Sequence, residues 1–246
     1  MFVRAIFRVT TSNTDDTQAL PVLWEEAGLV AIRKPGGMPT QPDQRADLDA
    51  LSIVQRMYPA ADIGLIHRLD RPVSGALLFA LNAIALAAMN ALFRERQVRK
   101  TYLAIVEGVT PATFTLEHRL EQDARSRKAR VGPNGQIARL RGRRLAEGDH
   151  YSLIEIEPDT GLFHQIRAQL AAQGTPIKGD VKYGARRGEK DRSIALHAHT
   201  LSFRHPVTGT PVLVTAPPPI VPVWSSLLGL SSRRAEKDGE DPVPGG

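Results

Sequence analysis

The stretch GLIHRLDRPVSG at residues 64–75, followed by the apolar run ALLFA at 76–80, carries the strongest structural signal in this chain. Charged side chains stand between two apolar runs, and glycines and a proline restrict the backbone around them. This pattern predicts a loop that leads into a buried strand. Loops held by rigid flanks often carry functional residues, although from composition alone a plain charged turn is the simpler interpretation.

Further elements are predicted on both sides of this loop. Residues 29–32 form an apolar strand that ends at the turn KPGG (34–37), and apolar residues at helical spacing predict a helix between 48 and 57. After the loop, Asn82 can cap a helix that runs to about Arg94. The remaining sequence predicts a helix at 164–173, a short amphipathic segment at 223–228, and strands at 102–106, 114–116, 138–140, 151–156, 196–203 and 211–215.

These elements predict an α+β fold, in which a mainly antiparallel mixed sheet is flanked by helices. The polar start without periodicity predicts a flexible arm over residues 1–20. One folded domain is expected over 21–230. The charged, Gly/Pro-rich end predicts a disordered tail over 231–246.

Composition narrows the function classes. The 246 residues carry a formal net charge of +6, which favours a polyanionic partner such as nucleic acid. The absence of cysteine excludes disulfides, zinc fingers and thiolate catalysis. There is no long apolar run, so we expect neither a signal peptide nor a membrane span, and we expect a cytoplasmic protein. P-loop, serine-hydrolase and dinucleotide-binding motifs are absent, and His197 with His199 lacks a third metal ligand.

The string HRLD-x-x-x-SG at 67–75 closely resembles the catalytic loop of the RluA-like family of RNA pseudouridine synthases. Other segments match patterns of the same family in the same order, over about residues 22–215. These segments are KPGG at 34–37, KTYLA at 100–104, TG with HQIR at 160–167, IKGD with YG at 177–184, and HAHTLSFRHP at 197–206. The resemblance implies the pseudouridine synthase catalytic fold over 21–230.

The resemblance also implies the site. Asp70 is the catalytic carboxylate, Tyr102 stacks on the uracil ring, and Arg167 is expected to pair with Asp70 so that the buried carboxylate stays ionised. Arg68 is expected to enter the RNA duplex and hold the target base extruded. The further substrate-binding residues that it implies are His67, Leu69, Lys100, His164, Gln165 and Ile166. The reaction needs no cofactor and no metal, the expected partner is a structured ribosomal or transfer RNA stem-loop, and we expect a monomer.

The chain departs from the family pattern at Val73, at Leu162-Phe163 and at Gln169. Leu162-Phe163 replaces the usual Arg-Thr, and Gln169 stands where histidine is common. We expect these departures to affect substrate contacts more than the chemistry. Many relatives carry a small N-terminal RNA-binding domain, for which the arm here is too short, so the catalytic domain is expected to find its RNA largely unaided.

A second basic feature lies between Arg119 and Arg144, with few acids and with the turn GPNG at 132–135. It fits a phosphate-contacting region or a solvated hairpin equally well. Its basic residues are Arg119, Arg125, Arg127, Lys128, Arg130, Arg139, Arg141, Arg143 and Arg144.

Two other functions fit parts of the sequence. An RNA-binding module of the same fold would not need Asp70, Tyr102 and Arg167 together. A nucleoside-cleaving glycosidase would need a second carboxylate, for which Asp180 is the candidate, although its Gly-Asp setting resembles a turn.

Overall fold

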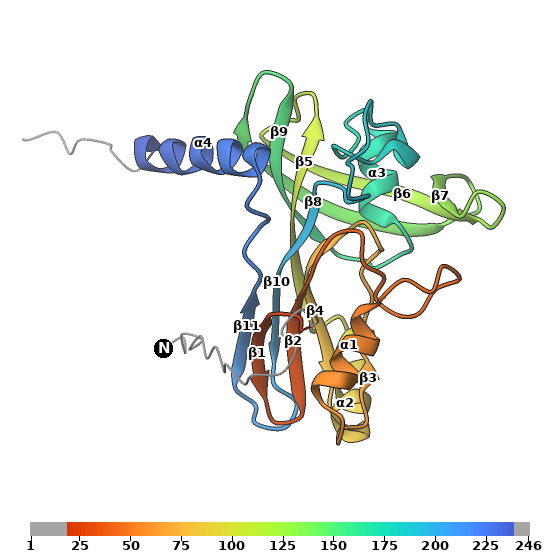
Figure 1. Cartoon of the computed structure of the whole chain (residues 1–246). Helices are drawn as coiled ribbons and strands as arrows, with labels where there is room; N and C mark the ends of the chain where they lie inside the picture. Colours follow the sequence, from red (N-terminus) through yellow and green to blue (C-terminus); the bar gives the residue numbers. More distant parts are fainter. Residues whose placement is uncertain (1–18, 239–246) are drawn as a thin grey trace, which may run out of the picture. The chain divides into compact units, whose positions relative to one another are not determined.

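The computed structural model describes residues 19–238 (Figure 1). The chain divides into two compact units, the first made of Met1–Tyr102 with Gly188–Pro217 and the second of Leu103–Arg187 with Pro218–Gly246. The sequence predicted a single domain over 21–230 and did not anticipate this division.

The predicted flexible arm, residues 1–20, lies outside the described residues except for its last two positions. Leu20 is buried at 7 % exposure. The next residue is also tied down, because the Pro21 carbonyl accepts a hydrogen bond from the Arg33 N–H at 2.8 Å. Leu20 and Pro21 thus both belong to the packed part of the first unit, and the predicted flexible arm stays a prediction.

The first unit is built on strands in the order β1-β2-β4-β10, with β11 paired to β10 and the short β3 paired to β4. All of these pairings are antiparallel except that of β4 with β10, which is parallel. The strands are β1 (Val22–Glu26), β2 (Leu29–Lys34), β3 (Gly64–Leu65), β4 (Ser74–Ala80), β10 (Leu196–Arg204) and β11 (Pro211–Thr215).

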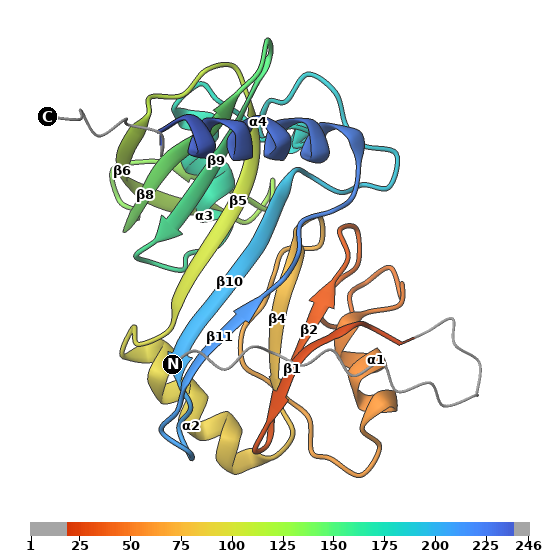
Figure 2. The same ribbon diagram turned by 90° about the vertical axis from the view of Figure 1, so that its left-hand side faces the viewer.

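Two helices lie on one face of this sheet, α1 (Ala50–Met57) and α2 (Ala83–Arg94) (Figures 1 and 2). Both begin at an N-cap side chain: Asp49 accepts from the Ser52 N–H at 3.0 Å, and Asn82 accepts from the Ala85 N–H at 2.8 Å, as predicted for Asn82. Helix α2 buries Met89 in the same apolar cluster as Leu29 and Leu78. Strand β4 is buried along its whole length, which makes it a rigid base for the loop before it.

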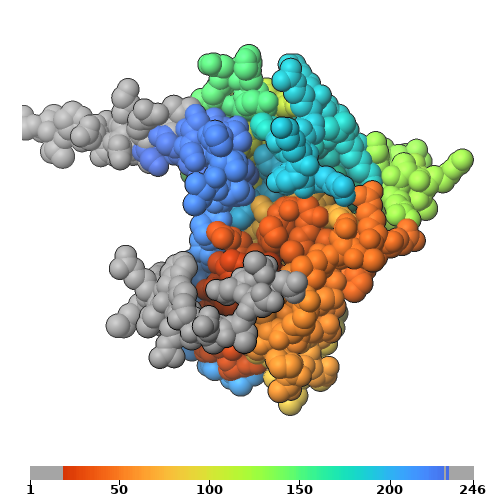
Figure 3. Space-filling view, viewed as in Figure 1, coloured from red at the N-terminus to blue at the C-terminus, as the bar shows by residue number. Residues whose placement is uncertain are grey.

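Strand β5 (Arg99–Glu107) begins in the first unit and ends in the second, where the strand order continues as β9-β8-β6-β7. The pairings β9–β8, β8–β6 and β6–β7 are antiparallel. The bounds are β6 (Thr113–Asp123), β7 (Lys128–Val131), β8 (Gln136–Glu147) and β9 (Tyr151–Pro158). The turn between β6 and β7 projects from the second unit in the space-filling view (Figure 3).

The second unit carries helix α3 (Gln165–Ala172) on one face of its sheet and α4 (Pro222–Asp238) on the other (Figures 1 and 2). Ala168 of α3 packs on Leu120 and Ala138 of the sheet. Trp224 and Leu227 bury the inner side of α4. A short 3-10 helix, η1 (Val181–Tyr183), follows α3.

The α+β fold with a mainly antiparallel sheet is confirmed, and the predicted strands and helices are all present. Three differences stand out. Strands β1, β3 and β7 were not predicted, and β6 and β8 are longer than expected. Helix α4 continues to Asp238 through the predicted disordered tail, because Arg, Ala, Glu and Lys in 231–238 extend a helix readily once it has started. Residues 239–246 lie outside the described part. None of the described helices has the length and apolarity that crossing a membrane requires.

Candidate active site

The loop predicted to be catalytic connects β3 to β4 in the first unit. Along it Arg68 is exposed, Leu69 is buried at 5 % exposure and Asp70 is half-buried. The Val73 N–H donates to the Asp70 carbonyl at 3.0 Å and closes a four-residue turn. The turn therefore presents Asp70 at the edge of the interior, directly after the buried Leu69 and two positions after the exposed Arg68.

The Ser-Gly pair that ends the loop is required by the pairing of β4 with β10. Gly75 has a φ of 123°, and a Cβ there would lie 2.2 Å from the Ala198 carbonyl oxygen, so only glycine fits this close approach. The Ser74 hydroxyl lies 2.8 Å from Nδ1 of His197, whose Nε2 faces the Ala216 carbonyl at 3.1 Å. His197 is thus a structural side chain, and no group of residues suited to hold a metal ion occurs in the described part of the chain.

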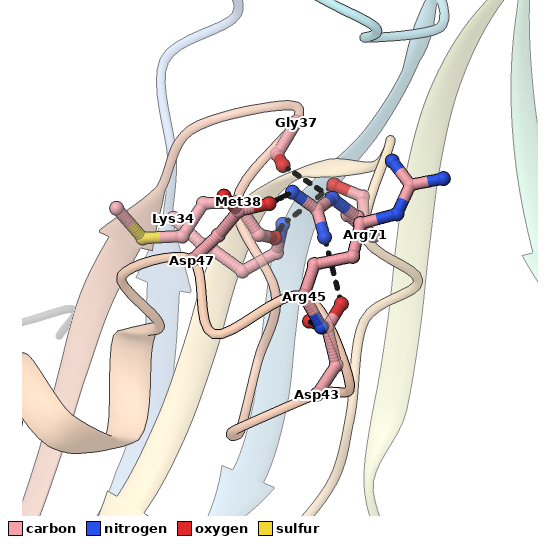
Figure 4. Close-up of polar contacts among 7 residues, drawn as sticks. All are labelled: Lys34, Gly37, Met38, Asp43, Arg45, Asp47 and Arg71. Atoms are coloured by element: carbon pink, nitrogen blue, oxygen red, sulfur yellow. Dashed lines mark hydrogen bonds and ion pairs between the residues drawn. The ribbon is translucent and has the colours of Figure 1, made fainter.

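The turn after β2 fixes the loop through backbone contacts. The Thr40 hydroxyl donates to the Leu69 carbonyl at 2.7 Å and accepts from the Leu69 N–H at 3.2 Å. The Arg71 Nε donates to the Gly37 carbonyl at 3.0 Å, and Lys34 donates to the Arg71 carbonyl at 3.3 Å (Figure 4). These contacts hold the residues on both sides of Asp70, so that its backbone has little freedom.

Arg71 also binds the loop before α1. Its guanidinium pairs with Asp43 at 2.7 Å and with Asp47 (Figure 4). The Arg71 charge is therefore matched by two carboxylates, and it is a positioning residue that the sequence analysis did not identify.

Lys34 is the most deeply buried charged group of the site, with no exposed surface. Its side-chain nitrogen donates to the carbonyls of Pro35 at 3.0 Å, Met38 at 2.7 Å and Arg71 at 3.3 Å, one acceptor for each N–H of the protonated amine. Figure 4 shows the contacts with Met38 and Arg71. The Lys34 pKa is lowered to about 7, chiefly by burial; the negative charge of Asp70 opposes this shift, and the charge of Arg71 adds to it. A titratable amine thus lies within electrostatic range of the candidate catalytic carboxylate, where the sequence had predicted only a turn.

Tyr102 and Lys100 lie on the first half of β5. Burial and then the charge of Asp70 raise the Tyr102 pKa, so the phenol keeps its proton at neutral pH and can donate it in a hydrogen bond. The ammonium of Lys100 lies 5.9 Å from the centre of the Phe93 ring, and burial lowers its pKa. The structure therefore brings Asp70 within electrostatic range of Tyr102 and Lys34.

His67 faces the interior of the first unit. Its Nε2 accepts from the Leu78 N–H at 3.1 Å, and its ring stacks on Phe93 with 5.3 Å between ring centres. Burial and then the charge of Lys100 lower its pKa to about 3, so the ring is neutral. These contacts make His67 a support of the loop, and its predicted contact with substrate stays a prediction.

In the second unit Arg167 forms a buried bidentate ion pair. Its Nε and a terminal nitrogen lie 2.7 and 2.9 Å from the two oxygens of Asp180, and its guanidinium lies 4.9 Å from the centre of the Tyr183 ring. Both oxygens of Asp180 are occupied in this way, which makes it a poor second catalytic carboxylate for a glycosidase. The predicted pair of Arg167 with Asp70 stays a prediction.

The remaining residues of the HQIR segment differ in exposure. Gln165 is buried, accepts from the Thr160 hydroxyl at 2.8 Å and the Leu162 N–H at 3.0 Å, and donates to the Arg139 carbonyl at 2.9 Å. Ile166 is buried at 7 % exposure, whereas His164 is half-buried at the surface. Gln165 and Ile166 therefore secure α3, His164 is the most exposed of the three side chains, and their predicted contacts with substrate stay predictions.

Gln169, a departure from the family pattern, is fully buried. Its amide donates to the carbonyls of Leu116 at 3.2 Å and Ala138 at 3.1 Å. It therefore joins α3 to the sheet, and the expectation that it affects substrate contacts loses its structural basis.

The basic stretch 119–144 contains two different surfaces. The exposed arginines of β8 are paired across the strands: Arg139 with Glu117 at 2.6 Å, Arg143 with Glu155 at 2.8 Å, and Arg141 with Asp159 at 3.3 Å. The stretch itself holds few acids, but acids of neighbouring segments of the fold pair with the arginines of β8. The cations around the β6–β7 turn, at 125, 127, 128 and 130, outnumber the two acids nearest to them in the sequence, Glu121 and Asp123, and Arg130 pairs with Glu121 at 3.7 Å.

Comparisons with known proteins define the class. The fold matches the solved structure of human RNA pseudouridylate synthase domain containing 1 with a TM-score of 0.74 and 25 % sequence identity, over 95 % of this chain and 100 % of the human one. A family model described as RNA pseudouridylate synthase matches residues 28–172. The chain belongs to the family of RNA pseudouridine synthases, as its motifs predicted.

Two curated relatives illustrate the range of the family. The ribosomal large subunit pseudouridine synthase C of Vibrio vulnificus is 31 % identical over 205 residues, which cover 80 % of this chain and 65 % of that enzyme. The tRNA pseudouridine synthase C of Salmonella typhimurium is 33 % identical over 226 residues, 80 % of this chain and 85 % of the relative. The chain thus spans just under two thirds of the first relative and most of the second.

Proposed function

We propose that the protein isomerises uridine to pseudouridine in structured ribosomal or transfer RNA, with Asp70 as the reacting carboxylate. The observation that carries this proposal is the position of Asp70, half-buried on a loop that Thr40, Lys34 and Arg71 anchor through its neighbours. The named relatives that act on ribosomal or transfer RNA support the choice of substrate class.

The isomerisation is balanced within one nucleoside. The bond between C1′ and N1 breaks, the uracil turns, C5 bonds to C1′, and the proton of C5 is lost while N1 gains one. Asp70 would attack the nucleoside or relay a proton, with the protonated phenol of Tyr102 against the ring. Lys34 lies within electrostatic range of Asp70, so that its protonated form attracts negative charge at the reacting site.

Extruding the target base costs a few kcal/mol of stacking energy. Arg68 is the exposed residue of the loop, two positions before Asp70, and its planar guanidinium could occupy the space that the base leaves. We assign Arg167 to the site on the family resemblance, with its bond to Asp180 fixing its orientation. The cytoplasmic location and the monomeric state remain predictions.

Tritium release tests the proposed function. Because C5 exchanges its hydrogen for the bond to C1′, unmodified rRNA and tRNA transcripts made with uridine tritiated at C5 should release tritium to water with the wild-type protein. Asp70→Asn keeps the shape and removes the charge, so its single-turnover rate should fall by at least about a hundredfold. The matched control is Asp62→Asn, an exposed aspartate of the same unit, which should react like the wild type. Undiminished release by Asp70→Asn would remove this carboxylate from the mechanism.

A genetic comparison identifies the substrate. Pseudouridine positions mapped in total RNA with and without this gene should differ at one or a few sites in ribosomal or transfer RNA. Identical maps would contradict the proposed function.

A further inference from the structure

An aromatic pair stands at the start of helix α3. Phe163 is 40 % exposed, and its ring is stacked on His164 with 3.8 Å between ring centres and 18° between planes. Phe163 replaces a residue that the family pattern has as threonine, so the aromatic ring is a feature of this chain.

His164 is fixed in place below this ring. Its Nδ1 lies within hydrogen-bond distance of the Tyr183 hydroxyl, at 2.8 Å, and the same hydroxyl accepts from the Ala129 N–H at 2.7 Å. Burial lowers the His164 pKa to about 3, with smaller contributions from Arg167 and Lys182, so the imidazole is neutral. Phe163 thus rests on a rigid, uncharged support, and its outer face needs no rearrangement to receive a ligand.

A hollow of about 340 Å³ opens beside Phe163 within the second unit. Leu162 and Phe163 form one wall, and β6, β7 and the start of β8 form the others. Its volume is within the usual range of small-ligand sites, about 300–1,000 Å³. The side chains of Gln122, Asn134 and Gln136 add amide donors and acceptors to its lining.

The only charged side chain that lines the hollow belongs to Glu121. Its carboxylate accepts from the Asn134 N–H at 2.8 Å and pairs with Arg130 at 3.7 Å. With the carboxylate occupied by these contacts, the hollow combines an aromatic face with a polar, amide-bearing edge. A nucleobase has the matching chemistry, since its faces stack and its edge forms hydrogen bonds.

Cations lie on the elements that surround the hollow. Lys182 of η1 donates to the Arg127 carbonyl at 2.6 Å and ties η1 to the β6–β7 turn. Lys128 and Arg130 flank Ala129, which lines the hollow, and their side chains therefore point to the opposite face of β7. The β6–β7 turn is the projecting part of the second unit (Figure 3). Positive charge next to a stacking platform is the combination that binds single-stranded nucleic acid, because the cations hold the phosphates while the ring stacks a base.

We propose that Phe163 and the hollow beside it bind an unpaired base of the RNA substrate, a base other than the uridine that is isomerised. The proposal deepens the proposed function, because it adds a second point of recognition to the same substrate. It makes Phe163 a residue that determines RNA choice in this chain, since the family pattern has threonine there. The amide lining and the neighbouring cations favour RNA over an apolar protein segment as the occupant.

Binding of a defined strand tests the proposal without knowledge of the natural target. The probes are a ten-nucleotide oligouridylate and an abasic strand with the same backbone. Phe163→Ala should weaken binding of the oligouridylate by about five- to 150-fold, the range of one lost base–aromatic stack, and leave binding of the abasic strand unchanged. Phe163→Trp should bind like the wild type. Phe163→Leu, which keeps an apolar side chain without an aromatic face, should resemble Phe163→Ala.

The matched control is Ile137→Ala. Ile137 is also 40 % exposed and follows Gln136 on β8, so its side chain points to the opposite face of the strand. This variant should bind both strands like the wild type, and melting curves should show that all variants are folded. Equal weakening of both strands by Phe163→Ala, or no weakening of either, would overturn the proposal.

Two further results separate the alternatives. Light scattering should give the same mass for the wild type and Phe163→Ala, and a change from dimer to monomer would show instead that the hollow joins two copies of the chain. If Phe163→Ala binds the oligouridylate normally while the wild type releases tritium, this inference is overturned and the proposed function stands. If Phe163 contributes to base-dependent binding but the wild type releases no tritium, the inference about binding stands and the proposed function is overturned.

Discussion

At the scale of single residues, the surroundings of Asp70 combine a motif that is visible in the sequence with contacts that are not. The HRLD string identified Asp70 and Arg68 as candidates. It did not reveal Thr40 or Arg71, because their partners are backbone groups about 30 residues away that only the folded chain brings near. The same motifs also suggested Gln165 and Ile166 as substrate contacts, and both are buried. A family motif marks residues that pack as well as residues that bind.

Lys34 gives a prediction about pH. Its pKa in the folded protein is about 7, against 10.5 in an unfolded chain. Between these values the unfolded state binds a proton that the folded state lacks, so stability rises with pH; below pH 7 both states are protonated and the contribution is constant. Lys34→Met cannot titrate. The unfolding free energy of the wild type relative to this variant should therefore increase from pH 7 to pH 9, by at most about 1.4 kcal/mol per pH unit.

Urea unfolding at pH 6, 7, 8 and 9 measures this difference. The surface control is Lys190→Met, which should stay parallel to the wild type at every pH. If the curve for Lys34→Met is also parallel to that of the wild type, the pKa of Lys34 is the same in the folded and unfolded states, which contradicts the prediction.

At the scale of elements, the positions of strands and helices could be predicted from apolar patterns and turn residues. The pairing of charged side chains could not. The arginines of β8 look like one basic stripe along the sequence. Their acidic partners lie 12 to 22 residues away, on β6, on β9 and at Asp159 directly after β9, and the register of the strands places them side by side. Cross-strand pairing of this kind needs the register, which sequence periodicity does not provide.

This division of charge predicts two different responses to salt. Neutralising the four cations of the β6–β7 turn, as Arg125→Gln, Arg127→Gln, Lys128→Gln and Arg130→Gln together, should weaken RNA binding and flatten the plot of log affinity against log salt. The slope should fall by up to about 3, because each phosphate contact contributes roughly 0.7–0.9. Filter binding of a stem-loop between 50 and 300 mM salt measures it.

The β8 arginines are the control for this experiment. Arg139→Gln, Arg141→Gln and Arg143→Gln together remove nearly as much charge, but each of these side chains already faces a carboxylate. Their loss should change the slope much less. If the two sets change it equally, the turn is not a separate RNA-contacting surface.

At the scale of the whole chain, the sequence predicted one domain and the contacts divide into two compact units. The division is hard to see in the sequence because the first unit returns after the second, in residues 188–217, and because β5 supplies residues to both. No composition shift or linker marks a boundary that falls inside a strand. Whether such a chain behaves as one domain is a question of cooperativity, which the two tryptophans of the sequence can answer.

One tryptophan lies in each unit. Trp24 packs edge-on against Phe203 in the first, and Trp224 is 3 % exposed in the second. We expect one cooperative transition, because unfolding either unit would unravel half of β5 and release the chain at each of the points where it passes between the units. Single-tryptophan variants, Trp24→Phe and Trp224→Phe, should therefore report the same urea midpoint.

Matched core substitutions make this test decisive. Ile32 in β2 and Ile154 in β9 are both fully buried, one in each unit, and replacing either by valine should cost about 0.5–1.5 kcal/mol. In a cooperative chain, Ile32→Val lowers the urea midpoint reported by Trp224 as much as the midpoint reported by Trp24. Ile154→Val likewise lowers both midpoints equally. If each substitution moves only the tryptophan of its own unit, the units unfold independently and the single domain predicted over 21–230 is wrong.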